Sequence, residues 1–261
     1  MTTVGFIGTG NMGSALARAA AKSGLADRIL LSNRSKDKAI RLAAEIGGEA
    51  LDNIEVAAQA DYLFLGVKPQ MLDCMLEGIH DTISKRTDRF VIVSMVAGKE
   101  LGELRELFAP QPVIRIMPNI PVGVGGGVTL FCGSDEVSDE EKAFLRGLLV
   151  HSGAVDELDE TLLDAATGIT GCGPAFAAIF AEALADGAVA CGLPRKKALN
   201  YAAQMMKGTA QLLETGEHPA ALKDRVCSPG GSTIQGVRTL EESAFRAAVM
   251  NAVIAAFEKE F

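Results

Sequence analysis

A loop near the carboxyl end of the chain combines features that favour binding of a small anion. Residues 226–236 have the sequence VCSPGGSTIQG. Pro229 fixes one backbone dihedral, and the two following glycines permit conformations that other residues avoid. Ser232 and Gln235 have the spacing of a capping box, so we expect a helix to begin there with Ser232 as its cap. Free N–H groups at such a start favour a carboxylate or phosphate, with the hydroxyls of Ser232 and Thr233 beside it. A plain turn between two helices is the alternative interpretation.

The amino-terminal end carries a second pattern that favours an anion. Gly8, Gly10 and Gly13 have the GxGxxG spacing, directly after an apolar run and directly before a helical pattern. In a dinucleotide-binding fold the first glycine makes the turn. The second lets the backbone approach the pyrophosphate, and the third lets helix and strand pack closely. This context predicts a dinucleotide site rather than a glycine-rich corner without a ligand.

The segment after the second predicted strand indicates which dinucleotide binds. An NAD site normally places an acidic residue there, against the ribose 2′-hydroxyl. This chain instead has Ser32, Asn33 and Arg34, whose hydroxyl, amide and guanidinium donors suit a 2′-phosphate. We therefore expect NADPH, with NADH as the alternative. Taken alone, Arg34 is equally typical of a solvated helix start.

Three further loops follow predicted strands, at residues 67–69, 94–98 and 117–121. Ligands of parallel sheets bind outside the carboxyl ends of the strands, so we expect the first two loops near the cofactor. The third loop contains Asn119 between two prolines, a stiff segment suited to meeting the nicotinamide ring. A structural turn is the other interpretation of that third loop.

The elements that position these loops fall into two classes. Up to residue 157, short apolar runs alternate with amphipathic segments, which is typical of a doubly wound α/β fold of the Rossmann type. The predicted strands are Val4–Ile7, Ile29–Ser32, Tyr62–Gly66, Phe90–Ser94, Val113–Met117, Gly127–Cys132 and Ala154–Glu157. The predicted helices between them are Met12–Ser23, Lys36–Glu45, Pro69–Ile79, Leu101–Phe108 and Asp139–His151, the last opened by a capping box of Ser138 and Glu141.

The rest of the chain is predicted to be all-helical. Its expected helices are Glu160–Cys191, interrupted near Pro174, and then Arg195–Thr215, Pro219–Val226, Ser232–Ser243 and Phe245–Lys259. We therefore expect a dinucleotide-binding domain at 1–157 and a helical substrate and dimerisation domain at 158–261. Apolar residues on more than one helix face predict a homodimer through this domain, with a higher oligomer as the alternative. The apolar run 169–191 contains two acidic residues, so it is predicted to be a buried helix rather than a membrane span.

Composition excludes several classes of function. The 261 residues carry a formal charge of −8 without a basic cluster, so we expect neither nucleic acid nor a membrane surface as a partner. Five scattered cysteines favour a reducing cytoplasm over a disulfide framework. The three histidines lie far apart, and no metal site is predicted. No signal peptide is expected at the amino terminus.

Several motifs occur together and in order along the chain. They are the glycine motif, Val67–Pro69, Ser94–Gly98, Met117–Asn119, Gly171–Ala175, His218-Pro219, Leu222–Asp224 and the 226–236 loop. This set resembles the pyrroline-5-carboxylate reductase family over essentially the whole chain. The most specific parts are Gly171–Ala175 and Ser228–Thr233, since the glycine motif is shared with many families.

The resemblance implies a reaction and a set of site residues. NAD(P)H delivers hydride to the C=N carbon of a small cyclic imine that carries a carboxylate, in the last step of proline biosynthesis. Amides of the Ser228–Thr233 loop hold the carboxylate, through Ser228, Gly230, Gly231 and Ser232. The Thr233 hydroxyl bonds the ring nitrogen, and Glu160 approaches the amine region. The implied cofactor residues are Ile7, Gly8, Thr9, Gly10, Asn11, Met12, Gly13, Ser32, Asn33, Arg34, Asn53, Gly66, Val67, Lys68, Pro69, Met95, Val96, Ala97 and Asn119.

The chemistry asks little of the protein, because a protonated imine is already an electrophile. Thr233 is the predicted catalytic residue, orienting the nitrogen and relaying a proton, although a mere helix-capping role is the alternative. The chain departs from the family at Ser232, where Thr or Ala is common, and at Cys172, where Ser is common. A substrate-proximal Glu of some members has no certain match, with Glu217 the nearest candidate.

Three other functions compete with this interpretation. A 3-hydroxyacid dehydrogenase would need a Lys on the first helix of the second half, and residues 162–192 contain neither Lys nor Arg. A reductase of other cyclic imines differs only in side chains that set ring size. A non-catalytic NADPH-binding regulator would have no need of the 226–236 loop.

Overall fold

The computed structural model describes residues 1–259. The chain forms two compact units, the first spanning Met1–Thr167 and the second beginning at Gly168. The division falls inside a helix, whereas we expected the helical part to begin at residue 158. The first two turns of this helix pack on the sheet of unit 1, since Leu163 is buried against Leu130 and Cys132.

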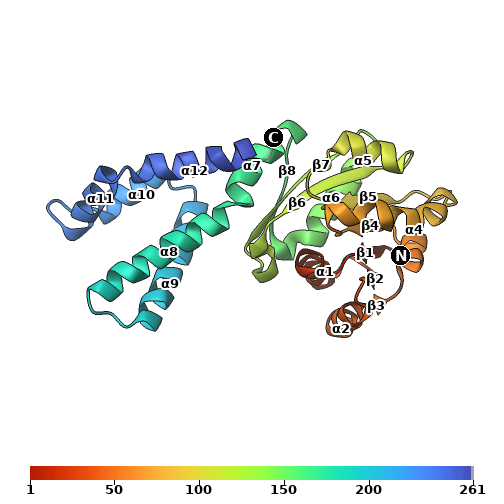
Figure 1. Cartoon of the computed structure of the whole chain (residues 1–261), viewed down its shortest axis with the longest axis horizontal. Helices are drawn as coiled ribbons and strands as arrows, with labels where there is room; N and C mark the ends of the chain where they lie inside the picture. Colours follow the sequence, from red (N-terminus) through yellow and green to blue (C-terminus); the bar gives the residue numbers. More distant parts are fainter. Residues whose placement is uncertain (260–261) are drawn as a thin grey trace. The chain divides into compact units, whose positions relative to one another are not determined.

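Unit 1 contains an eight-stranded sheet with the order β3-β2-β1-β4-β5-β6-β7-β8 (Figure 1). Neighbouring strands are parallel except for the antiparallel pair β6 and β7. The strands are β1 Thr3–Ile7, β2 Arg28–Ser32, β3 Glu49–Ala50, β4 Tyr62–Leu65, β5 Val91–Ser94, β6 Val113–Pro118, β7 Gly127–Gly133 and β8 Gly153–Glu157. The predicted Rossmann-type doubly wound sheet is confirmed.

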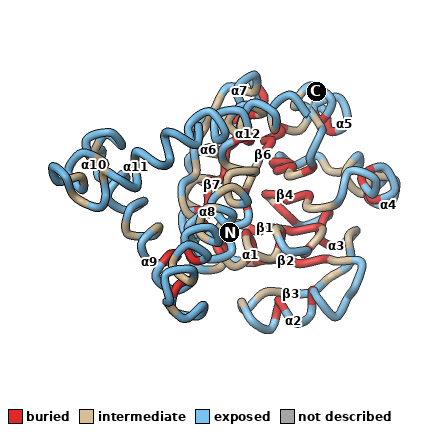
Figure 2. Tube along the Cα trace, turned by 60° about the vertical axis from the view of Figure 1, so that its left-hand side comes forward, coloured by how far each residue is buried: buried red, intermediate tan, exposed pale blue. Residues whose placement is uncertain are grey.

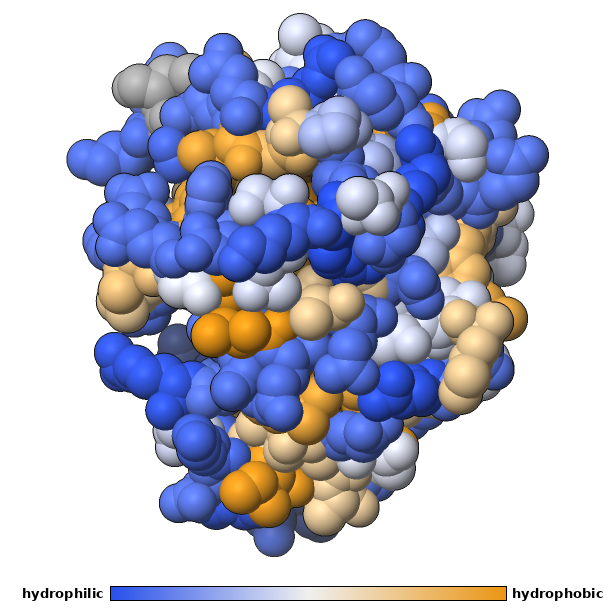
Figure 3. Space-filling model, turned by 90° about the vertical axis from the view of Figure 1, so that its right-hand side faces the viewer, coloured by the Kyte–Doolittle hydropathy of each residue, from blue (hydrophilic) through white to orange (hydrophobic). Residues whose placement is uncertain are grey.

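The central strands are hydrophobic on both sides because helices cover both faces of the sheet. Successive residues of β1 and β5 alternate between two cores: Phe6 and Val93 belong to one, Ile7 and Ile92 to the other. Phe6 stacks on Phe64 of β4 with ring centroids 4.5 Å apart. The central strands β1, β4 and β5 are accordingly buried along their whole length (Figure 2). Most of the face of the molecule seen in Figure 3 is hydrophilic, with hydrophobic residues in small groups.

The helices of unit 1 follow the predicted pattern with one addition. They are α1 Asn11–Ser23, α2 Lys36–Ile46, α3 Asn53–Gln59, α4 Leu72–Ser84, α5 Leu101–Phe108 and α6 Asp139–Leu149, with short 3-10 turns at Pro69–Met71, Ile120–Val124 and Val150–Ser152. Helix α3 was not predicted, although Asp52 and Glu55 form a reciprocal capping box at its start. The predicted box of Ser138 and Glu141 forms at the start of α6.

The remaining helices are α7 Glu160–Thr170, α8 Gly173–Ala190, α9 Arg195–Glu214, α10 Pro219–Val226, α11 Ser232–Glu242 and α12 Phe245–Lys259. The interruption expected near Pro174 separates α7 from α8. Proline has no N–H to donate and is tolerated in the first turn, which is where α8 places Pro174. Within unit 2, Phe180 of α8 packs near Phe245 of α12, with ring centroids 5.7 Å apart.

Unit 2 buries little of its own apolar surface. Helices α11 and α12 contain no buried residue within the described part of the chain. Ile179 on α8 is 65% exposed and Met250 on α12 is 59% exposed. The prediction of a buried helix over 169–191 is therefore wrong for the single chain (Figure 2). Glu160–Ala190 is long and apolar enough to cross a membrane by length and composition alone, with 11% of its apolar window buried.

Candidate active site

The loops predicted to bind the cofactor leave the sheet along one edge. Ile7 is in register with Ser32 on one side and Leu65 on the other, and Leu65 is in register with Ser94. These four residues end β1, β2, β4 and β5, so the loops that follow begin side by side. The strand order also reverses at β1, which has β2 on one side and β4 on the other. Such a switch point is where open α/β sheets bind ligands.

The glycine motif forms a close-packed turn at this edge. Gly8 has a φ of +99°, and a Cβ placed on it would lie 2.5 Å from the carbonyl oxygen of Gly66. A Cβ on Gly13 would lie 2.1 Å from the carbonyl oxygen of Gly8, whereas one on Gly10 would meet nothing within 4 Å. The turn therefore requires glycine at positions 8 and 13, and it leaves open space at Gly10. That arrangement fits the backbone approach of a pyrophosphate.

The start of α1 offers unpaired donors. Gly10 is the N-cap and supplies no side-chain cap, and the first helical bond runs from the Ser14 N–H to the Gly10 carbonyl at 2.9 Å. The N–H groups of the first three helical residues, Asn11–Gly13, thus come before the first hydrogen bond within the helix. The hydroxyl of Thr9, in the same turn, is buried and has no hydrogen-bond partner among the described residues. Both observations fit an anionic ligand at this helix start.

The segment after β2 presents donors and no competing carboxylate of its own. The buried Ser32 hydroxyl donates to the Asn53 Oδ1 at 2.6 Å, which holds the start of α3 against β2. The Asn33 amide donates to the Ser35 carbonyl at 3.2 Å. Arg34 is exposed and forms no ion pair with any described residue. The Asp52 carboxylate nearby is engaged as the cap of α3.

Asn119 has a structural function in this fold. Its Oδ1 accepts from the Val128 N–H at 2.8 Å, and its carbonyl accepts from the Val122 N–H at 3.2 Å. The side chain is buried and holds the 3-10 turn that follows β6 beside β7. Its expected contact with the nicotinamide ring stays a prediction.

The carboxyl-terminal loop of unit 2 is a tight turn. The Gly231 N–H donates to the Ser228 carbonyl at 3.0 Å, with Pro229 and Gly230 at the two central positions. Gly230 has a φ of +72°, as the third residue of a type II turn requires. A Cβ on Gly231 would lie 2.4 Å from the Ser228 Oγ and 3.2 Å from the Ser228 carbonyl oxygen, so a larger residue would require the Ser228 side chain to turn away.

The predicted cap of α11 is wrong by one residue. The helix begins at Ser232, its N-cap is Gly231, and no side chain within residues 1–259 caps it. The box predicted with Gln235 does not form because Ser232 already belongs to the helix. The first N–H groups of α11 therefore lack side-chain acceptors, and they remain available to an anion.

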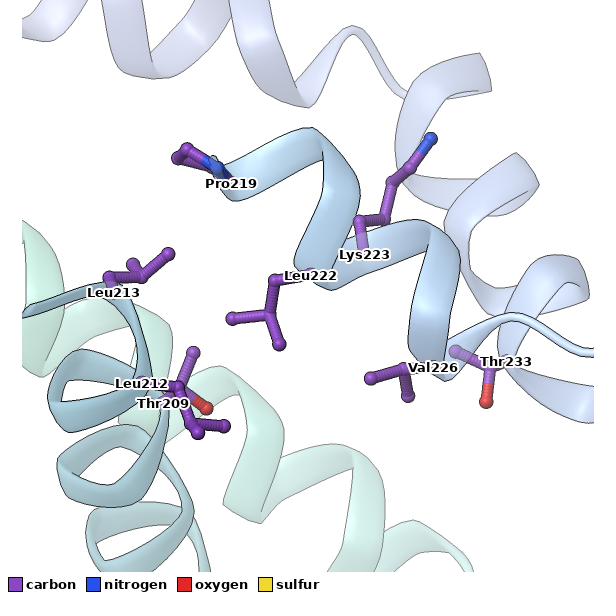
Figure 4. A pocket seen from close by; sticks show the side chains of 8 residues that line it. All are labelled: Thr209, Leu212, Leu213, Pro219, Leu222, Lys223, Val226 and Thr233. Atoms are coloured by element: carbon purple, nitrogen blue, oxygen red, sulfur yellow. The ribbon is translucent and has the colours of Figure 1, made fainter. Parts of the chain in front are cut away.

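Thr233 lines a cavity of about 350 Å³ within unit 2. The other lining residues are Thr209, Leu212 and Leu213 of α9 and Pro219, Leu222, Lys223 and Val226 of α10 (Figure 4). Leu222 and Val226 give this cavity an apolar wall. The Lys223 side chain points away from that wall (Figure 4), and its Nζ lies 2.9 Å from the Asp224 carboxylate. Thr233 thus presents a hydroxyl at the edge of an apolar hollow.

The two carboxylates considered for the substrate are both engaged by cations. Glu160 Oε1 accepts from Arg115 Nη1 at 2.8 Å and from the Leu101 N–H at 2.6 Å. Glu217 Oε2 lies 2.9 Å from Arg225 Nη2. The substrate contact expected of Glu160 stays a prediction.

Sequence reasoning missed Arg115. The available signal was a lone arginine in the apolar strand 113–117. Two acidic residues spaced i, i+4, Glu160 and Asp164, stand at the start of a later helix. Within residues 1–259, no group of three or more His, Cys, Asp or Glu side chains is placed to hold a metal ion.

Comparison with known proteins agrees with this arrangement. Residues 160–260 match the pyrroline-5-carboxylate reductase dimerisation family, and residues 3–98 match the family described as NADP oxidoreductase coenzyme F420-dependent. The pyrroline-5-carboxylate reductase of Escherichia coli is 40% identical, covering 98% of this chain and 96% of its own length. That of Arabidopsis thaliana is 38% identical, with coverage of 98% and 93%.

Solved structures extend the likeness to three dimensions. Pyrroline carboxylate reductase of Plasmodium falciparum, solved with NADP bound, has a TM-score of 0.85 and 32% identity, covering 99% of this chain and 97% of its own. The enzyme of Coxiella burnetii has a TM-score of 0.91 at 27% identity, with the same coverage. Both units of the fold, and the turn before Thr233, are thus found in a chain that belongs to the pyrroline-5-carboxylate reductase family.

Proposed function

We propose that this chain reduces 1-pyrroline-5-carboxylate to L-proline with NADPH, the last step of proline biosynthesis. The observation that carries the proposal is the turn at Ser228–Gly231. It joins a helix start without a side-chain cap to the hydroxyl of Thr233, as a small imine with a carboxylate requires. Relatives named pyrroline-5-carboxylate reductase match over nearly the whole chain.

The edge of the sheet in unit 1 is the proposed cofactor site. The N–H groups at the start of α1 and the open backbone at Gly10 would hold the pyrophosphate. Ser32, Asn33 and Arg34 would hold the 2′-phosphate, which favours NADPH over NADH. The loops Gly66–Pro69 and Met95–Ala97 complete the site, since they follow β4 and β5 at the same edge. When bound, the reduced nicotinamide supplies the hydride.

The residues around α11 are the proposed substrate site. The amides at its start would hold the carboxylate, with the partial positive charge of the helix end behind them. The Thr233 hydroxyl would bond the imine nitrogen and orient the C=N bond. A protonated imine needs no further activation, so this chain has to supply orientation, exclusion of water and one hydrogen-bond partner. The apolar wall of the adjoining cavity serves the exclusion of water.

We also propose a homodimer through the helical domain. Exposed apolar residues on α8 and α12 support it, together with the match to a dimerisation family. Glu182 and Asp186 lie in the most apolar helix, so we assign α8, Gly173–Ala190, to this contact rather than to a membrane. The negative charge disfavours nucleic acid, and five free cysteines favour the cytoplasm. Solution mass distinguishes a dimer from a higher oligomer.

The test is the oxidation of NADPH with and without pyrroline-5-carboxylate, with chromatographic detection of proline. We expect turnover that depends on the imine and yields proline stoichiometrically with NADPH consumed. A six-membered cyclic imine carboxylate, supplied in parallel, measures ring-size selectivity. Faster turnover of the larger ring would favour the alternative reductase. NADPH binding without turnover of either ring would favour a regulator and contradict the proposal.

A further inference from the structure

Arg115 is a buried cation that the proposed chemistry does not use. Its side chain is 5% exposed. Nη1 lies 2.8 Å from Glu160 Oε1, and Nη2 lies 3.5 Å from Asp164 Oδ1. Its Nε is buried and has no hydrogen-bond partner among the described residues. Burying a guanidinium is costly even when it is paired, and removing one partner of such a pair is more costly still. The cost of burying Arg115 therefore indicates that this arginine has a specific role in the protein.

The partners of Arg115 join three elements. Glu160 and Asp164 are spaced i, i+4, so they lie on the same face of α7. The same Glu160 oxygen accepts the N–H of Leu101, the first residue of α5, at 2.6 Å. Leu163, between the two acids, is fully buried against β7. We call Arg115, Glu160, Asp164 and the Leu101 amide the Arg115 clamp. It fixes the first turns of α7 to β6 and to the start of α5.

Each element of the clamp leads directly to a proposed site. Helix α5 follows the loop that contains Met95–Ala97. Strand β6 ends three residues beyond Arg115, at Pro118. Helix α7 carries the chain out of unit 1, because unit 1 ends at Thr167, less than one turn beyond Asp164. All of the chain that supplies Thr233 lies beyond that point.

Hydride transfer is sensitive to small displacements of the reacting groups. A misplacement of about 1 Å costs on the order of 100-fold in rate. Helix α7 has 11 residues and is about 16 Å long, so a tilt of about 5° moves its far end by about 1.4 Å. Loss of the clamp would therefore let α7 shift on the sheet of unit 1 by a distance of the size to which hydride transfer is sensitive.

We infer that Arg115 is a positioning residue for the reduction, and that Glu160 serves as its counter-ion rather than as a contact of the substrate amine. The inference rests on the proposed function. Arg115 acts through α7, which it holds in one direction, and through the start of α5. It touches neither the imine nor the nicotinamide.

The test combines Arg115→Met, Glu160→Gln and the double variant, each measured below its own unfolding temperature. We expect kcat of Arg115→Met to fall roughly 10- to 100-fold, with the Kd of NADPH changed less than about threefold because the glycine turn is intact. The double variant should lose no more than the worse single variant, since both changes open the same clamp. Arg105→Met is the matched control. This arginine pairs with Glu136 at 2.6 Å, is 43% exposed, and should leave kcat unchanged.

Arg115→Lys guards against a variant that fails to fold. It keeps the charge and loses the planar fork, so it should fold and recover part of kcat relative to Arg115→Met. A readout independent of turnover is hydrogen exchange in a peptide that contains Leu101. Its amide should exchange faster in Arg115→Met, because its acceptor Glu160 loses its anchor.

Three results would overturn the inference. One is a folded Arg115→Met or Arg115→Lys with wild-type kcat. Another is a raised KM for the imine in Glu160→Gln, combined with losses that multiply in the double variant, which would place Glu160 on the substrate. The third is unchanged exchange at Leu101. A wild-type protein without turnover would instead contradict the proposed function, and exchange at Leu101 would still test the clamp.

Discussion

Residues in both proposed sites act largely through backbone shape. Gly231 lacks a Cβ that would lie 2.4 Å from Ser228 Oγ, and Gly13 lacks one that would lie 2.1 Å from the Gly8 carbonyl. The contact at Gly13 is with backbone and is too short for any side chain, whereas the contact at Gly231 requires the Ser228 side chain to move. The polar side chains beside these turns include Thr233 at one, and Thr9 and Arg34 at or near the other. Their contributions are therefore separable by single substitutions.

Arg34 is predicted to set cofactor preference. Arg34→Ala removes a charge-assisted contact to the 2′-phosphate, so kcat/KM with NADPH should fall about 10- to 100-fold while that with NADH stays nearly constant. Steady-state assays with both cofactors give the ratio. Arg41→Ala, an exposed arginine on α2 whose Nε donates to the Asp37 carbonyl at 3.3 Å, is the control. An unchanged NADPH to NADH ratio in Arg34→Ala would refute this role.

Cys132 illustrates how burial controls reactivity. Burial, and then the negative charge of Glu160, raise the pKa of the Cys132 thiol from 9.0 to about 12. The folded state thus favours the neutral thiol. The buried neutral thiol contributes fully to the free energy of unfolding below pH 9.0. This contribution is lost as the pH rises toward about 12.

Alkylation with iodoacetamide at about pH 8 measures this protection, because only the thiolate reacts. We expect the exposed Cys74 on α4 to be modified in the folded protein and Cys132 only after unfolding. Peptide mass spectrometry distinguishes the two sites. Equal rates at both cysteines in the folded protein would contradict the predicted burial.

Most strands and helices were predicted from the spacing of hydrophobic residues along the sequence. The predicted strands agree with β1, β2 and β4 to β8 to within about one residue at each end. Helix α3 was missed because its seven residues are short for a periodic signal, and β3 because it has two. The cap of α11 was misplaced because Gly231 and Ser232 are both acceptable caps, and the choice depends on the turn at Ser228.

Helix α1 is predicted to require its close contact with the glycine turn. Gly13→Ala forces a Cβ against the Gly8 carbonyl, so α1 must move and the Kd of NADPH should rise at least about tenfold, a loss of about 1.4 kcal/mol. Gly78→Ala in α4 is the matched control, since its Cβ meets nothing within 4 Å. It should leave the Kd unchanged and stabilise the fold by about 0.5–1 kcal/mol. Fluorescence titration of NADPH checks both, and equal Kd values for the two variants would count against the predicted site.

At the scale of the whole molecule, the two units differ in how they bury apolar surface. Unit 1 has a core on each face of its sheet, whereas α8 and α12 of unit 2 leave residues such as Ile179 and Met250 exposed. Sequence patterns identified these helices as apolar and predicted α8 to be buried. They do not distinguish burial within one chain from burial against a second chain. The Arg115 clamp escaped prediction for a similar reason, because its members are brought together by tertiary structure.

The exposed face of α8 is predicted to be a dimer contact. Ile179→Asp places a charge in that contact and should weaken the dimer by roughly 100-fold or more, with loss of activity. Ile40→Asp on α2 is the control, because Ile40 is 55% exposed against 65% for Ile179. Light scattering after size exclusion should give at least twice the chain mass of 27.3 kDa for wild type and Ile40→Asp, and less for Ile179→Asp. An Ile179→Asp protein of wild-type mass and activity would contradict the assignment.

The proposed role of the Thr233 hydroxyl is tested by comparing wild type, Thr233→Ala and Thr233→Ser for reduction of pyrroline-5-carboxylate with NADPH and with NADH. We predict that wild type forms proline. In Thr233→Ala, kcat should fall 10- to 1,000-fold, on the order expected when a hydroxyl that bonds the nitrogen and relays a proton is lost. Thr233→Ser should recover part of this loss. The loss should be the same with both cofactors, because the hydroxyl acts on the imine. Full activity of Thr233→Ala would contradict the role given to the hydroxyl beside the Ser228–Gly231 turn.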